Sequence, residues 1–130
     1  MRDGQGLEVA NASAETIAAI DLLREEWLAF GKRLPEAVAA ADREQGCALL
    51  PLMSANLLLT VNSPAALEIA TRQAAKGRKL AGSDRREQGW LAATEAAFSH
   101  DKRTAQRLLE DLLAEWPRDL VAAKVAQVHA

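Results

Sequence analysis

The last third of the chain, residues 84–130, constrains the fold most, because it alternates helical segments with tight breaks. A helix opens after Asp84, Ser99-His100-Asp101 interrupts it, and Pro117 ends a second helix. A further helix starts after Asp119. A helix–turn–helix unit of this kind buries its apolar face by stacking on neighbouring units. The pattern therefore predicts stacked antiparallel helices, and it suggests a fragment of a longer array.

The residues before this segment add four more helical stretches, so we expect an all-α chain of about six to seven helices. Ser13 is placed to cap the first helix, whose apolar stripe extends to Phe30, and Pro64 suits the first turn of the fourth. The alternation typical of a strand is not found. The pattern predicts a flexible lead-in over residues 1–12 and a helical domain over residues 13–130.

Three parts of this domain are distinguished by their patterns. Residues 13–82 carry the N-terminal helices, residues 84–117 are the best-matching repeat, and residues 118–130 begin the next helix. The N-terminal part includes a helix expected over residues 48–61 that is apolar almost all round, which favours a helix covered on several sides. Cys47, the only cysteine, precedes this helix and is interpreted as a small buried hydrophobe.

Composition and charge limit the classes of partner. The formal net charge is -2, so neither nucleic-acid binding nor attraction to an anionic membrane is predicted. The longest apolar stretch is interrupted by polar residues and falls short of the roughly 20 residues that a membrane span requires. The first residues lack the apolar core of a secretory signal. We therefore expect a soluble cytoplasmic protein.

The proline at position 117 also fits the end of a 34-residue helical repeat. Counting back from it places the small residues of the two helices at Ala93 and Ala105, and a large apolar residue at Leu109. Gly89 stands where a tryptophan is usual, with Trp90 one place later. The register resembles a tetratricopeptide repeat, in which Ala93 and Ala105 mark the closest approach of the two helices.

A second resemblance rests on longer motifs. The Arg-Glu pair at 86–87, Trp90-Leu91-Ala92-Ala93, the run of residues 108–113, and Pro117-Arg118-Asp119-Leu120 are similar to the N-terminal part of the tetratricopeptide repeat protein 38 family. In this chain Ser99-His100-Asp101 replaces the Gly-Asp break of that family. The resemblance implies an all-helical superhelical scaffold without established catalytic residues, of which this chain is an N-terminal fragment or a shortened relative.

Residues that could perform chemistry are few and dispersed. His100 and His129 are the only histidines and lie on different elements, without the nearby carboxylates of a metal site. The acidic pairs, such as Glu110-Asp111, fit helix caps or solvent-facing surfaces, and no glycine-rich phosphate loop follows a strand. We therefore predict a protein that is not an enzyme and that uses no metal or cofactor.

Binding to a protein partner, or to a second copy of the chain, is the predicted function. Trp116 is a large side chain beside a helix end, and Arg85 and Arg86 stand at a helix start, where cations oppose the helix dipole. Stacked repeats also leave an apolar face at the end of the array. The last helix therefore predicts an open face for association, formed by Val121, Val125 and Val128.

A different class of function remains open. Asn56 is an isolated polar residue in the apolar third helix, and a buried amide requires hydrogen-bond partners. A ligand is one such partner, while a backbone carbonyl or a water molecule would serve equally. The alternative hypothesis is a small-molecule-binding or enzymatic helical domain, with an apolar pocket among the first, third and fifth helices.

Overall fold

A computed structural model of the chain describes residues 1–29 and 31–129. Phe30, expected in the first helical stripe, and Ala130, the end of the predicted domain, lie outside the described residues. Within the described part the chain forms seven helices and no strand, apart from one isolated bridge between Arg2 and Glu8. The predicted all-α class with about seven helices is therefore confirmed.

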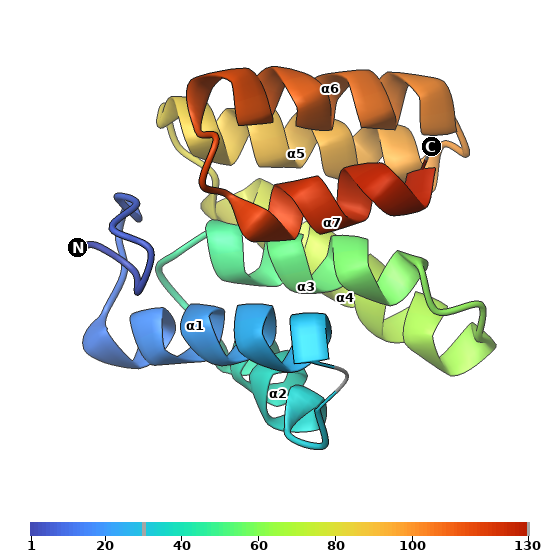
Figure 1. The fold of residues 1–130 in the computed structure, drawn as a ribbon. Helices are drawn as coiled ribbons and strands as arrows, with labels where there is room; N and C mark the ends of the chain where they lie inside the picture. Colours follow the sequence, from blue (N-terminus) through green and yellow to red (C-terminus); the bar gives the residue numbers. More distant parts are fainter. Residues whose placement is uncertain (30, 130) are drawn as a thin grey trace.

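The helices form three consecutive hairpins and one final helix (Figure 1). In chain order they are α1 (Ala14–Ala29), α2 (Leu34–Arg43), α3 (Leu49–Leu59), α4 (Pro64–Leu80), α5 (Arg85–Phe98), α6 (Lys102–Glu115) and α7 (Leu120–His129). In Figure 1, α1, α3, α5 and α7 all begin at the left and end at the right. We call the side where these four helices begin the closed end and the side where they end the open end.

Helix starts are set by short polar side chains, as the sequence predicts. Ser13 Oγ accepts a hydrogen bond from the Thr16 N–H, and Asp84 Oδ2 accepts one from the Glu87 N–H, at 3.1 and 3.0 Å. Ser63, Asp101 and Asp119 accept equivalent bonds at α4, α6 and α7. Each cap satisfies a backbone donor that the helix leaves unpaired. The capping box that Asp84 and Glu87 could make at α5 is only half formed, because the Glu87 side chain accepts from the Gly82 N–H instead.

Helix α3 lies at the centre of the molecule and contacts α1, α2, α4, α5 and α7. All of its residues from Leu49 to Leu57 are buried, which confirms that this apolar helix is covered on several sides. Cys47, just before it, is also fully buried. None of the helices in the described part combines the length and apolar character needed to cross a membrane.

Small residues allow the paired helices to approach closely. A Cβ atom on Gly77 of α4 would lie 2.5 Å from Leu52 of α3, and one on Gly89 of α5 would lie 2.7 Å from Leu112 of α6. Ala93 and Ala105 are both fully buried in the second of these hairpins. Glycine therefore occupies the tightest helix contacts, where any side chain would force the helices apart.

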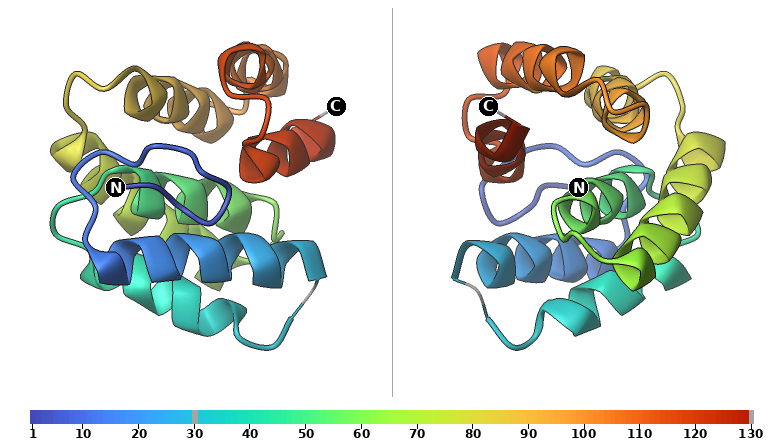
Figure 2. Two further views of the ribbon diagram at one scale, coloured as in Figure 1. Left: turned by 60° about the vertical axis from the view of Figure 1, so that its left-hand side comes forward. Right: turned by 90° about the vertical axis from the view of Figure 1, so that its right-hand side faces the viewer.

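Helix α7 folds back over the array instead of leaving an open face. It packs on α6 and also contacts α3 and α1, so the first and last helices meet (Figure 2). Val121 and Val125 are consequently buried at 4% and 0% exposure, whereas Val128 stays exposed. The expectation that Val121 and Val125 form an open association face is therefore wrong, because the curvature of the array already covers them.

Residues 1–12, expected to be a flexible lead-in, take up a packed loop at the closed end. Leu7 and Val9 are buried, and the Val9 N–H donates to the Met1 carbonyl at 2.8 Å. Asp3 Oδ1 accepts from the backbone N–H groups of Gln5 and Leu7, and the Gly4 N–H donates to Asp21 of α1. The segment thus belongs to the helical body, because two apolar side chains tie it to the core.

Candidate functional site

The closed end contains a buried ion pair that connects three parts of the chain. Arg86 of α5 donates from Nε and Nη2 to Asp119 Oδ2, at 3.1 and 2.9 Å, and from Nη1 to the Glu8 carbonyl. Trp90 Nε1 donates to the same carboxylate oxygen, while the other oxygen accepts from the Ala122 N–H to cap α7. Arg86 and Asp119 are 3% and 1% exposed. The predicted role of Arg86 in partner binding is therefore wrong, because its guanidinium is already paired inside the protein.

Two other predicted residues, Arg85 and Trp116, do come together. They line a shallow groove of about 170 Å³ between α5 and α6, and Trp116 is partly buried against the core. The Arg85 guanidinium is exposed but already pairs with Glu115. An incoming acidic group would have to displace that carboxylate. The groove is therefore a weak candidate site for an anionic partner.

A hollow of about 570 Å³ lies at the closed end between α1 and the α2–α3 connection. Glu44 lines this hollow, and its carboxylate accepts hydrogen bonds from Thr16 Oγ1 and from the N–H groups of Gln45, Gly46 and Cys47. Burial alone would raise the pKa of Glu44, but the Thr16 hydroxyl and these N–H groups together hold it below its usual value. Its carboxylate is therefore committed to holding the start of α3.

A second hollow, about 360 Å³, lies at the open end, where α3, the α5–α6 turn and the end of α7 converge. We call it the open-end groove. Its apolar walls include Val61 and Leu67, which are 44% and 51% exposed. Its polar lining includes His100, Lys102 and His129. The remaining lining residues are Leu58, Leu59, Asn62, Ser63, Pro64 and Ala97. Apolar side chains and potential cations thus share one exposed surface.

Two features of the histidines distinguish this groove. The Nε2 atom of His129 is buried and has no hydrogen-bond partner among the described residues. Burial, and then the charge of Lys102, hold the pKa of His129 below its usual value. His100 has a φ of +59°, in the left-handed region where glycine is usual. Its backbone closes α5, because the N–H groups of His100 and Asp101 donate to the carbonyls of Ala97 and Ala96.

The sequence did not predict this groove. Leu67 stays exposed because the face of α4 that packs is Ala66, Ala70, Gln73 and Gly77. His100 and His129 lie on different elements, and the fold brings both to one groove. The break at Asn62-Ser63-Pro64, with an apolar residue on each side, is the one sequence signal that could have indicated it.

Residues with potential reactivity do not assemble into a recognisable centre. Within residues 1–29 and 31–129, no group of three His, Cys, Asp or Glu side chains has the geometry to hold a metal ion. Burial, followed by the nearby carboxylates of Glu44 and Glu87, raises the pKa of Cys47 to about 11. A thiol with such a pKa remains protonated and unreactive at neutral pH.

Asn56, which prompted the alternative of a ligand pocket, has a partner within the protein. Its Nδ2 donates to Thr94 Oγ1 at 2.8 Å, and the Thr94 hydroxyl donates to the Trp90 carbonyl at 2.7 Å. The Asn56 Oδ1 is buried without a described partner. The amide thus joins α3 to α5 through Nδ2, and this contact satisfies its donor side without a ligand among α1, α3 and α5.

No family model, curated protein or solved structure matches the chain significantly. The resemblance to the tetratricopeptide repeat protein 38 family therefore has no support beyond the residues that suggested it, and it stays a prediction.

Proposed function

We propose that this chain is a non-catalytic helical-repeat module that binds a protein partner, and that the open-end groove is its binding surface. The observation that carries the proposal is the exposure of Val61 and Leu67 on the walls of a concave groove. Exposed apolar side chains that gather around a hollow are typical of surfaces that a partner covers. The predicted repeat character, the longer parent chain and the cytoplasmic location are parts of the same proposal.

The chemistry of the groove favours binding over catalysis. Among its described lining residues the one hydroxyl, on Ser63, accepts from the Ala66 N–H to cap α4. The imidazoles of His100 and His129 share the groove with Lys102, and Asp101 beside them bonds to Thr104 through both carboxylate oxygens. A histidine that acts as a general base is usually oriented by an acidic partner, and the Asp101 carboxylate is committed to Thr104. The groove lining instead resembles a recognition surface with apolar walls.

The test compares two exposed leucines of similar exposure at opposite ends. Leu67 is 51% exposed at the open end, and Leu120 is 42% exposed at the start of α7. Proteins captured from a cell extract by immobilised wild-type chain are quantified against Leu67→Ser and Leu120→Ser baits. We expect a partner that Leu120→Ser retains and Leu67→Ser loses. Equal capture by all three baits would rule out the groove as the interface.

Self-association is measured separately, because the predicted partners include a second copy. Light scattering after size-exclusion chromatography gives the mass of each variant over a range of concentrations. A dimer that dissociates in Leu67→Ser but not in Leu120→Ser would make a second copy the partner. A wild-type monomer at every concentration would leave a different protein as the partner, provided that the capture experiment finds one.

A further inference from the structure

The loop of residues 1–12, which we call the N-terminal loop, is attached to the first helix and to the fifth. The Gly4 N–H donates to Asp21 Oδ1 of α1 at 2.8 Å, and the Glu8 carbonyl accepts from Arg86 Nη1 of α5 at 3.3 Å. The loop lies across the closed end in both Figure 1 and Figure 2. It therefore connects the helix that begins the array to a helix of the third hairpin.

Arg86 also connects the loop to the last helix. Its Nε and Nη2 atoms donate to Asp119 Oδ2, and Asp119 Oδ1 accepts from the Ala122 N–H at the start of α7. One chain of hydrogen bonds therefore extends from α1, through the N-terminal loop and the guanidinium of Arg86, to α7. The two helices that it joins are the first and the last of the array.

Apolar contacts follow the same path. Leu7 and Val9 of the loop are buried, and Val9 belongs to the same core cluster as side chains of α1, α5 and α7. The buried residues of α7 are all small: Val121, Ala122, Val125 and Ala126. Each small side chain buries little apolar area, so the position of α7 over α1 also depends on the loop that packs into the same cluster.

Two features lower the cost of detaching the loop. The loop covers the ion pair of Arg86 and Asp119, and water would hydrate both charges once the loop leaves, which offsets part of the lost apolar burial. The loop also makes hydrogen bonds within itself, since Asp3 Oδ1 accepts from the N–H groups of Gln5 and Leu7. Few of its backbone groups therefore depend on the helices.

We infer that the N-terminal loop is a clasp that keeps the helical array closed. It holds α7 and the first turn of α5 against α1, and its detachment opens the closed end as one unit while α3 and α4 stay folded. Helices α3 and α4 are held by a close contact of their own, at Leu52 and Gly77. The inference does not rest on the proposed function, because the residues that carry it do not line the open-end groove.

The experiment measures amide hydrogen exchange along the full chain in two variants. Val9→Asp should detach the loop, because a carboxylate at this fully buried position would have no compensating partner. Val128→Asp is the matched control, because Val128 is an exposed valine of α7. In Val9→Asp we expect exchange on the order of tenfold faster at residues 86–90 and 120–126, with little change in α3 and α4. The control should change neither region.

A reversible disulfide provides the opposite variant. A Cβ atom on Gly4 would lie 3.0 Å from Asp21 Oδ1, so Gly4→Cys combined with Asp21→Cys places two thiols within reach of each other. Cys47 does not compete, because it is fully buried and its thiol stays protonated. Oxidation fixes the loop to α1, and exchange at residues 120–126 should become slower than in the reduced form of the same variant. Comparing the two forms cancels the effect of the substitutions.

Three outcomes would overturn the inference. Equal acceleration in every helix of Val9→Asp would mean that the loop stabilises the whole fold and does not control one end. Acceleration confined to residues 1–12 would mean that the loop detaches without moving α7. If Val9→Asp does not fold, the disulfide variant decides the question, and exchange at residues 120–126 that oxidation leaves unchanged would reject the clasp.

Discussion

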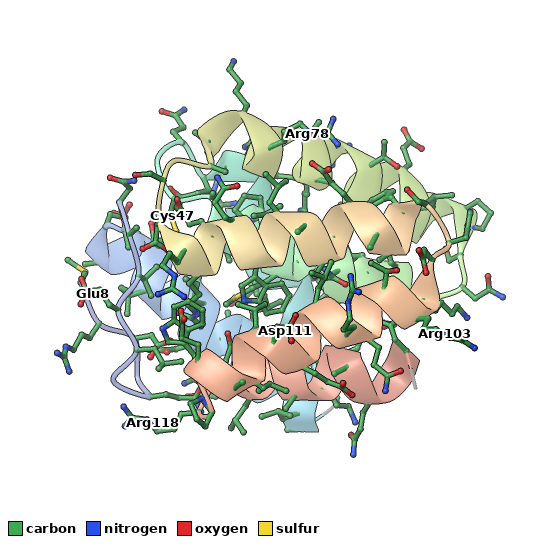
Figure 3. The ribbon with its side chains drawn as sticks, turned by 90° about the horizontal axis from the view of Figure 1, so that it is seen from above. Glu8, Cys47, Arg78, Arg103, Asp111 and Arg118 are labelled. Atoms are coloured by element: carbon green, nitrogen blue, oxygen red, sulfur yellow. The ribbon has the colours of Figure 1, made fainter. Side chains whose placement is uncertain are left out.

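The two ends of the helical array are finished in opposite ways. At the closed end, Arg86 and Asp119 are buried and paired, and the loop of residues 1–12 covers them. Figure 3 shows Glu8, Cys47 and Arg118 gathered at this end, with Arg103 at the other. At the open end, Val61 and Leu67 are exposed and His129 Nε2 has no described partner.

This difference separates polar groups that hold the fold together from surfaces that remain open to a partner. Burying a charged group costs free energy unless hydrogen bonds within the protein replace those that the group made to water. The Nε and Nη2 atoms of Arg86 make such bonds to Asp119. The closed end therefore uses the Arg86–Asp119 pair to hold α5, α7 and the N-terminal loop together. The open end instead exposes Val61 and Leu67 around a hollow, which is why we propose the binding surface there.

The largest effect on the closed end is expected when the buried guanidinium of Arg86 is removed. Arg86→Met leaves the Asp119 carboxylate buried with Trp90 and the Ala122 N–H as its remaining donors. We expect a loss of about 3–5 kcal/mol in the free energy of unfolding, measured by urea denaturation. Arg85→Met is the matched control, because the neighbouring arginine makes an exposed ion pair worth at most about 1 kcal/mol.

A double variant tests whether the loss comes from the unpaired charge. Arg86→Met combined with Asp119→Asn removes the buried carboxylate charge and keeps a side chain that can cap α7. It should be more stable than Arg86→Met alone. If Arg86→Met and Arg85→Met have the same urea midpoint, the ion pair does not stabilise the closed end as described.

The next effect concerns the α5–α6 hairpin that spans both ends. Ala93 and Ala105 are fully buried, so Ala93→Leu or Ala105→Leu should overpack the contact and cost about 1–3 kcal/mol. Ala92 is exposed one position round the helix, and Ala92→Leu should cost much less. Chemical denaturation of the three variants checks this. Equal midpoints would show that the register counted from Pro117 is wrong.

Local features of this fold could be predicted from the sequence, and features that depend on curvature could not. Ser13 is predicted as a cap, and helix starts are predicted after Asp84 and Asp119, because a cap requires only residues within one turn. The return of α7 onto α3 and α1 depends instead on the angles between successive hairpins. Those angles follow from contacts between hairpins, such as that of Asn56 in α3 with Thr94 in α5, which no local pattern reveals.

The candidate site was missed for the same reason. Arg86 looked available because cations are unfavourable at a helix start, and the pairing with Asp119 is a contact between residues 33 positions apart. The exposure of Leu67 could not be predicted, because helical spacing identifies an apolar residue without showing which neighbour covers it. Sequence reasoning named the right kinds of residue, but the fold determined which of them face a partner.

A smaller effect, of opposite sign, is expected at the open end. His100→Gly relieves a left-handed residue, a conformation that costs an L-residue about 1–2 kcal/mol, although the more flexible unfolded chain offsets about 0.4–1 kcal/mol. The net gain in stability should be at most about 1.6 kcal/mol, seen as a higher melting temperature. Ser99→Gly, at the preceding position with a φ of -81°, should give no gain. A loss of stability in His100→Gly would mean that the imidazole supports the fold.

The smallest effect is the pH dependence that His129 gives to the open end. Burial, and then Lys102 of α6, lower the pKa of His129 in the folded protein, while the unfolded chain keeps a value near about 6.5. The unfolded chain therefore binds more protons as the pH falls, and stability decreases with it. The contribution of the neutral ring is complete above about pH 6.5 and is lost as the pH falls below that value.

His129→Gln should flatten the stability profile between about pH 5 and 7, and Lys102→Gln should flatten it partly. His100 is present in both proteins, so the difference between wild type and His129→Gln isolates the one ring. An unchanged profile in His129→Gln would show that the ring exchanges freely with solvent and that the end of α7 does not bury it.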